Sequence, residues 1–385
     1  MIFNLFVAYL LLVTLVSLKS AISDKLFYFN SLLIILFVGL RGYDVGSVDT
    51  LNYVNFFVGK QSYYNTDTRD IESGFVIYND VLKVFISTGW QYLLFNAAFS
   101  LVPLFYLIKK YSSNIHFSLL LFFVGLGLLY TVYFVCTRQV IATAFVLWGI
   151  IIFLNKTRFY PYFFVILSIL GAMIHSSVPM ISIAFIVLLR VKIPRNVYVS
   201  ICVGTFVLGY VGFFENFDVL KGIFLYLNFV FSRLSSYADI SFADKSFFLY
   251  PFTRSLIGVI ICFVARDKLY NDVFTKLFLV SIIIGNLFPS FQEIYRLVGL
   301  FSIFGLVSST YIYDAMFVLK FNRLKTYMIT KKLVKPFVTM SLAFIVFYSY
   351  YKFADYLILL ETKKGIIDNA TLVPYKFFWE DKYNF

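Results

Sequence analysis

The chain consists of long apolar runs separated by short polar connections. Runs of about 15 to 20 apolar residues have the length that a helix needs to cross the hydrocarbon core of a membrane. The pattern therefore predicts an all-α, polytopic membrane protein with about 12 transmembrane helices. The predicted spans lie near residues 3–18, 26–40, 90–108, 115–135, 137–154, 159–174, 176–190, 196–213, 248–265, 272–289, 293–313 and 336–352.

One further stretch, residues 72–88, has a mixed pattern. Glu72, Asn79, Asp80 and Lys83 alternate there with large apolar side chains. A helix with one polar and one apolar face settles at the membrane surface. We therefore expect this stretch to lie in the interface, or to dip into it, without crossing the membrane.

The charged residues divide unequally between the two sides that this arrangement creates. The connections on one side hold about half of the 33 Lys and Arg residues but only four of the 20 Asp and Glu residues. Cytoplasmic loops of membrane proteins carry such an excess of basic residues. This side is therefore predicted to be cytoplasmic, with 314–335 as its most basic loop and both chain termini on the opposite side.

The predicted organisation is one transmembrane bundle, 1–352, followed by an outward-facing tail, 353–385. Two long loops of the bundle, 41–89 and 215–247, are also predicted to face outwards. The outer stretches are rich in Tyr, Phe, Asn and Asp, a mixture that stacks on sugar rings and hydrogen-bonds to them. The same aromatic residues are also typical of the belts that lie at membrane interfaces.

Composition agrees with a membrane protein and argues against several kinds of partner and site. Of the 385 residues, 61% are hydrophobic and 14% are charged, and the mean hydropathy is +0.85. The net charge of +13 is explained by topology and by contact with anionic membrane lipids, so it does not indicate a nucleic-acid partner. Cys136, Cys202 and Cys262 have no paired spacing, and His116, expected to be structural, and His175 are the two histidines. We therefore expect no disulfide framework, no metal centre and no cofactor.

Polar and charged residues gather at the predicted outer ends of the spans. Arg41 follows the second span, and Arg138 opens another near a helix N-terminus, where unpaired backbone N–H groups also favour an anion. Several arginines together could hold a diphosphate and offset the charge on it as it leaves. Each alone could instead form a salt bridge, such as Glu293 with Arg296, or extend to lipid head groups. The outer set comprises Arg41, Asp44, Asp49, Glu72, Arg138, Gln139, His175, Ser176, Arg254, Gln292, Glu293, Tyr295 and Arg296.

His175 is the first candidate for a general base. It stands between two apolar runs, 159–174 and 177–189, where the chain must reverse on the outer side. The ordinary pKa of histidine lies near neutral pH, so this side chain could take a proton from a hydroxyl nucleophile. It could equally cap a helix or bind a head group. Asp49 and then Glu72 are the next candidates for the same role.

Several different short motifs are distributed along the chain. They are Arg41-Gly42 with Gly46, Asp49 and Tyr53; Glu72-Ser73-Gly74-Phe75; Thr137-Arg138-Gln139 with Ala142; His175-Ser176-Ser177; Tyr295-Arg296; and Pro374-Tyr375. In this order and placement they resemble the EpsG-like branch of the Wzy polysaccharide polymerases.

The resemblance implies an enzyme of the bacterial inner membrane that joins oligosaccharide repeat units of O-antigen, capsule or exopolysaccharide. Such enzymes are similar in architecture to GT-C glycosyltransferases, here with the site facing the periplasm. Their donor is an oligosaccharide linked to undecaprenyl diphosphate, which is therefore the expected partner besides membrane lipids. A chain-length regulator protein is a further candidate partner.

On this basis we expect the nascent chain on one undecaprenyl diphosphate to move to a hydroxyl of a second lipid-linked repeat unit. Arg138 and Arg296 are expected to bind the donor diphosphate. Arg41 or Arg254 is expected to assist on the second lipid. The predicted substrate-binding residues are Arg41, Arg138, Gln139, Arg254, Tyr295 and Arg296.

Other functions are open from the sequence. An O-antigen ligase would use the same chemistry and is separated from a polymerase only by the family resemblance. A lipid-linked oligosaccharide flippase or another transporter would place charged residues deep in the bundle and often show internal symmetry, whereas here the polar residues gather outside. A membrane acyltransferase would use a histidine such as His175, and a structural membrane partner would need none of these charges.

Overall fold

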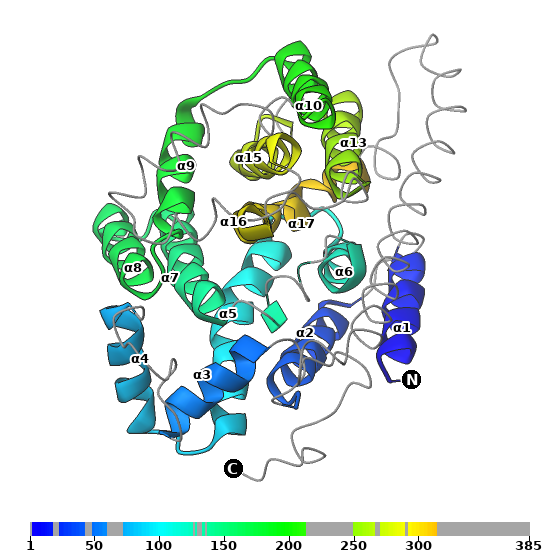
Figure 1. Cartoon of the computed structure of the whole chain (residues 1–385). Coiled ribbons are helices and arrows are strands. Elements are labelled where there is room, and N and C mark those ends of the chain that lie inside the picture. Colours follow the sequence, from blue (N-terminus) through cyan, green and yellow to red (C-terminus); the bar gives the residue numbers. More distant parts are fainter. Residues whose placement is uncertain are drawn as a thin grey trace.

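The computed structural model describes residues 2–17, 23–42, 48–59, 72–125, 128, 133–134, 137–212, 249–265, 270–288 and 292–313. Within these ranges the chain forms helices and no strand, which confirms the all-α prediction (Figure 1). The helices are α1 (Ile2–Ser17), α2 (Asp24–Gly39), α3 (Val48–Val58), α4 (Ser73–Lys83), α5 (Gly89–Tyr111), α6 (Ile115–Leu120), the π-helix η2 (Leu121–Gly125), α7 (Thr137–Leu154), α8 (Tyr160–Ile174), α9 (Pro179–Arg190), α10 (Arg195–Tyr210), α13 (Leu249–Val264), α15 (Val273–Leu287), α16 (Gln292–Ser302), α17 (Gly305–Ser308) and α18 (Tyr311–Tyr313).

Two of these helices, α5 and α7, are long and apolar enough to cross a membrane by length and composition. Five further apolar segments, such as Tyr160–Ile174 and Val273–Leu287, are between 10 and 17 residues long. The apolar helices indicate a membrane protein. The total of about 12 spans stays a prediction.

The outer surface of α8 also suits a lipid environment. Phe163, Ile166 and Ile169 lie three residues apart along this helix, and all three are exposed. Soluble monomers seldom expose a continuous row of large apolar side chains. Contact with lipid tails would cover this row.

Local sequence explains where several helices begin and end. The Asn114 side chain accepts a hydrogen bond from the Phe117 N–H at 2.9 Å and so caps the start of α6. Proline occupies one of the first two positions of α8 and of α9, where its missing N–H is not needed. His175 follows α8 in an extended conformation, so the chain turns there before α9.

The predicted span 293–313 is divided in the structure. It forms α16, α17 and α18, with turns at 303–304 and 309–310. The N–H groups of Phe304 and Leu306 bond to carbonyls three residues back, which is tighter than α-helical bonding. The Thr310 hydroxyl also donates to the Val307 carbonyl at 2.6 Å, a bond that competes with helix continuation. The predicted span 115–135 is irregular as well, because α6 passes into η2.

Helix α3 lies within the predicted outer loop 41–89 and was not expected from the apolar runs. Its buried residues Thr50, Val54 and Phe57 recur at intervals of three or four, the helical spacing that could have revealed it. The Thr50 hydroxyl donates to the Phe134 carbonyl at 2.8 Å and holds α3 against the chain before α7.

The mixed stretch 72–88 does contain a helix, α4, as the sequence predicted. Its position relative to a membrane stays a prediction. Loops 215–247 and 314–335, the span 336–352 and the tail 353–385 lie outside the described residues.

The described parts of several connections that were predicted to be cytoplasmic lie at one end of the bundle. Lys109 forms an ion pair with Asp24, and the Ser113 N–H donates to the Thr310 hydroxyl at 2.9 Å. The neighbouring Tyr311 donates its hydroxyl proton to the Asp272 carboxylate at 2.8 Å. This grouping agrees with helices that run alternately in opposite directions, and the side that faces the cytoplasm stays a prediction.

A close approach at the other end brings α4 against α8, which are neighbours in Figure 1. A Cβ atom on Gly74 would lie 2.5 Å from the Met173 Cβ and 2.6 Å from its carbonyl oxygen, distances that only glycine permits. Gly74 is two residues after Glu72, and Met173 is two residues before His175. The contact therefore brings two of the predicted site residues to the same end of the bundle.

We expect Gly74→Ala to lower the midpoint of thermal unfolding in detergent, because overpacking at such a contact costs about 1–3 kcal/mol. Gly204→Ala is the matched control, since a Cβ atom at Gly204 meets nothing within 4 Å. The control should keep the wild-type midpoint or raise it slightly, because alanine is the better helix former. Equal midpoints for the two variants would contradict the close approach.

Candidate functional site

Arg138, in the first turn of α7, is enclosed by residues of α3 and α4. Its Nε–H donates to the Tyr53 hydroxyl at 2.8 Å, and one terminal nitrogen pairs with the Glu72 carboxylate. The side chain of Arg138 is 10% exposed and that of Glu72 is 21% exposed. A charge so far removed from water is costly unless it is paired and hydrogen-bonded. The ion pair and the hydrogen bond to Tyr53 together therefore join three separate segments of the chain.

Aromatic rings surround this pair. The guanidinium carbon of Arg138 lies 5.5 Å from the centroid of the Tyr53 ring and 5.9 Å from that of Phe75, within the range of cation–π attraction. The two rings meet edge to face at 5.5 Å. Tyr53 is 5% exposed and Phe75 is 0% exposed. The sequence suggested that aromatic residues of the outer loop either stack on sugars or form a belt at the membrane interface. Neither interpretation applies to Tyr53 and Phe75, because both side chains are buried around Arg138.

Tyr78 of α4 is partly buried next to the aromatic rings of the site, because its ring stacks on that of Phe75 at 6.5 Å. The Tyr78 hydroxyl donates to the Asn96 side-chain oxygen at 2.5 Å. Burial raises the pKa of Tyr78 well above its ordinary value, and the nearby Tyr92 adds to the rise. Tyr78 therefore stays protonated and uncharged.

Gln139, the residue after Arg138, is the link toward His175. Its side-chain N–H group lies 3.5 Å from the Ser177 hydroxyl oxygen. That hydroxyl is 2.9 Å from Nδ1 of His175, and the Ser177 N–H donates to the same ring nitrogen at 3.3 Å. With Nδ1 accepting from the backbone, a neutral His175 carries its proton on Nε2. The structure thus brings His175 together with Gln139 and, through it, with Arg138.

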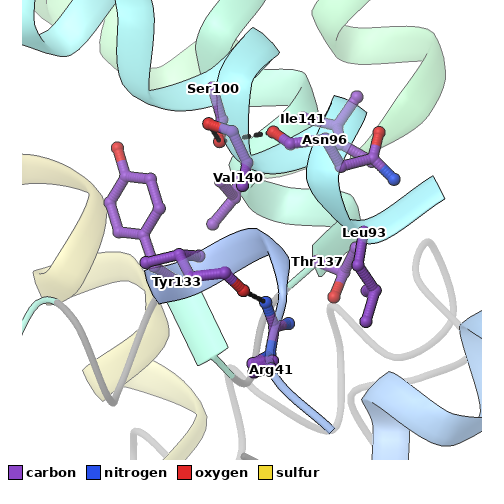
Figure 2. A pocket seen from close by; sticks show the side chains of 10 residues that line it. Arg41, Leu93, Asn96, Ser100, Tyr133, Thr137, Val140 and Ile141 are labelled. Carbon is purple, nitrogen blue, oxygen red and sulfur yellow. Dashed lines mark hydrogen bonds between the residues drawn. The ribbon is translucent and has the colours of Figure 1, made fainter. Parts of the chain in front are cut away.

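Arg41 is buried, so neither a solvated loop nor extension to lipid head groups describes its side chain. It donates to the Val38 carbonyl at 2.5 Å, and its guanidinium carbon lies 5.1 Å from the centroid of the Phe134 ring. Figure 2 shows it facing a cavity of about 20 Å³ that is also lined by Asn96 and Thr137. This volume holds about one water molecule. Because Thr137 precedes Arg138, Arg41 belongs to the same end of the bundle.

Arg254 lies elsewhere, on α13 against α15 and α16. A Cβ atom on Gly285 would lie 3.3 Å from a terminal nitrogen of Arg254 and 3.4 Å from Val298 of α16. The next residue, Ser255, donates to the buried Asn286 side chain at 3.1 Å. Arg254 therefore packs near the helix that carries the predicted Arg296, and the described contacts do not join it to Arg138.

Several predicted site residues have no described side chain. Asp49 belongs to α3, one turn before Tyr53, and Tyr295 and Arg296 belong to the start of α16. Their proposed roles stay predictions. The other members of the outer set without a described side chain are Asp44, Gln292 and Glu293.

Three residues that contribute to the site, Tyr53, Phe75 and Ser177, were not among the predicted site residues. All three stood in the motifs that carried the family resemblance, so a signal was present in the sequence. Their roles depend on contacts with residues far along the chain, which the sequence does not give. The described residues contain no group of three or more His, Cys, Asp or Glu side chains arranged to hold a metal ion.

The apolar helices indicate a helical membrane protein, and an arginine, a carboxylate and a histidine gather at one end of the described bundle. The chain belongs to the EpsG family, whose model matches residues 24–377. This match confirms the family resemblance seen in the sequence, and it suggests a glycosyltransferase-like polysaccharide polymerase. Comparison with curated proteins and with solved structures gives no match.

We expect Tyr53→Phe to lower the midpoint of thermal unfolding in detergent. The variant keeps the ring beside Arg138 and removes the hydroxyl that accepts from Nε, and a hydrogen bond to a charged group contributes about 1.5–3 kcal/mol. Tyr28→Phe is the control, because Tyr28 is 59% exposed. If both variants unfolded at the wild-type temperature, the Tyr53 hydroxyl would not be stabilising Arg138.

Proposed function

We propose that this protein is a polysaccharide repeat-unit polymerase of the Wzy type. It transfers the nascent glycan from undecaprenyl diphosphate to a hydroxyl of a second lipid-linked repeat unit. The site is proposed to face the periplasm of a bacterial inner membrane, which is the orientation predicted from the distribution of basic residues.

The observation that carries this proposal is the meeting of motifs that lie far apart in the sequence. Tyr53, Glu72, Arg138 and His175 come from four different motifs of the family resemblance. Hydrogen bonds and an ion pair connect the first three directly, and Gln139 and Ser177 extend the connection to the fourth. The EpsG family model matches residues 24–377, a range that includes all four of these residues.

Arg138 has the chemistry that a diphosphate leaving group requires. A guanidinium presents N–H donors in a planar fork that matches phosphate oxygens, and it stays charged at any working pH. In the transfer, the acceptor oxygen bonds to the anomeric carbon of the donor sugar while the bond from that carbon to the diphosphate breaks. The electron pair leaves with the diphosphate, where Arg138 offsets the added charge. Arg296 is proposed to assist on the same diphosphate, and Arg41 or Arg254 on the second lipid.

His175 is the proposed general base, ahead of Asp49 and Glu72. The acceptor hydroxyl must lose its proton as its oxygen attacks, and a neutral imidazole suits this step. In the tautomer that the Ser177 N–H favours, Nδ1 is the ring atom able to take the proton. The Ser177 hydroxyl stands beside Nδ1 and offers a route to it.

The polymerase proposal is tested by the glycan pattern of a bacterial strain that lacks this gene and is complemented with variants. We expect deletion to collapse the ladder of glycan lengths to a single repeat unit and wild type to restore it. Arg138→Ala should fail to restore it, because losing the arginine removes roughly 2–5 kcal/mol of transition-state stabilisation. Arg158→Ala, an exposed arginine between α7 and α8, is the control and should restore the ladder.

Loss of even the single-unit band on deletion would instead indicate a ligase or a flippase. An unaltered ladder would overturn the proposal. A restored ladder with Arg138→Ala at the wild-type protein level would remove Arg138 from the site.

We expect His175→Ala to slow chain elongation by about 10²- to 10⁴-fold, the range for loss of a general base. His116→Phe is the control, because His116 is buried at the opposite end of the bundle beside Phe27 and its ring nitrogens have no hydrogen-bond partner among the described residues. Elongation is measured with purified protein and a lipid-linked repeat unit in membrane nanodiscs. Similar rates for His175→Ala and wild type would assign the proton to another group.

A further inference from the structure

We propose that the Glu72 carboxylate occupies the place of the substrate diphosphate on Arg138, and that the diphosphate enters by displacing it. The inference rests on the proposed function, because it takes a lipid-linked diphosphate as the anion that Arg138 binds. It adds that binding is an exchange of one anion for another at the same guanidinium.

The partners of Arg138 differ in how they are held. Tyr53 and Phe75 are buried, at 5% and 0% exposure, and they pack against each other. The Glu72 side chain is 21% exposed, so among the described partners of Arg138 it is one that solvent or a ligand can reach. Displacing Glu72 would leave the aromatic surroundings of Arg138 in place.

The position of Glu72 in the chain also suits displacement. Glu72 is the residue that precedes the first turn of α4, a position where side chains commonly cap the helix by accepting from its N–H groups. The Glu72 side chain makes no such hydrogen bond. The carboxylate can therefore leave Arg138 without removing a cap from α4.

Tyr53 would keep Arg138 oriented during the exchange. Its hydroxyl binds Nε, whereas Glu72 binds a terminal nitrogen. A diphosphate that replaces the carboxylate meets a guanidinium whose plane is already fixed, and it brings more negative charge and more acceptor oxygens than the carboxylate. The resting ion pair thereby lowers the affinity for weak anions and yields to a strong one.

Anion exchange and a purely structural ion pair predict different changes in the affinity of Glu72→Gln for undecaprenyl diphosphate. The amide keeps the size of the side chain and its hydrogen-bond acceptor but removes the competing charge. If Glu72 competes with the ligand, the variant should bind undecaprenyl diphosphate about three- to tenfold more tightly than wild type. If Glu72 only holds Arg138 in place, the variant should bind the same or more weakly.

The test measures direct binding of undecaprenyl diphosphate, and of undecaprenyl monophosphate for comparison, to the full-length protein in nanodiscs. Asp80→Asn is the matched control: it removes a carboxylate from the same helix, one that pairs with Lys83 at 3.6 Å on the exposed side, and it should leave the affinity unchanged. Glu72→Ala provides a second variant without the charge. Its affinity should also exceed that of wild type, and a cooperative thermal unfolding transition above the temperature of the binding measurement would establish that it is folded.

Tighter binding of the diphosphate by Glu72→Gln, with Asp80→Asn at the wild-type affinity, would establish the exchange. Unchanged or weaker binding by folded Glu72→Gln and Glu72→Ala would overturn it, as would a wild-type protein that binds no undecaprenyl diphosphate. The glycan ladder decides the polymerase proposal independently. If the glycan ladder changes as expected for a polymerase but Glu72→Gln binds with unchanged affinity, the exchange is refuted and the polymerase proposal is retained.

Discussion

The structure depends on keeping an arginine charged among apolar helices. The side chain of Arg138 is largely removed from water, and such a charge is tolerated only where other groups replace its hydration. Glu72 supplies the opposite charge, Tyr53 accepts a hydrogen bond, and aromatic rings cover the guanidinium faces. Because these groups come from α3, α4 and α7, meeting the needs of one side chain fixes how three helices lie at this end of the bundle.

Close packing provides the geometry that this pairing needs. Gly74 lets α4 approach the backbone of α8 at Met173, and the approach places Glu72 and His175 at neighbouring helix ends. The opposite end is organised by ordinary polar contacts, such as the Lys109–Asp24 ion pair. The bundle thus has one end where Arg138 is buried and paired with a carboxylate, which suits a site for an anion, and another where polar contacts hold the connections together.

An arginine that is already paired with a carboxylate can discriminate between anions. In the proposed exchange, the carboxylate on Arg138 excludes weak anions and yields to a ligand with greater charge and more acceptor oxygens. The ligand proposed for this exchange is a lipid-linked diphosphate. The Ser177 hydroxyl beside His175 extends the same site toward proton transfer.

The sequence by itself determined the helical class, most helix positions and the family, because apolar run length, charge bias and short motifs are local properties. It also marked Arg138, Glu72 and His175 as candidates. Tertiary structure alone decided that Arg138 pairs with Glu72, that Tyr53 and not an exposed sugar-binding ring completes the pair, and that Arg254 packs apart from it. These outcomes depend on which distant helices pack together, and a pairing across tens of residues leaves no periodic signal in the chain.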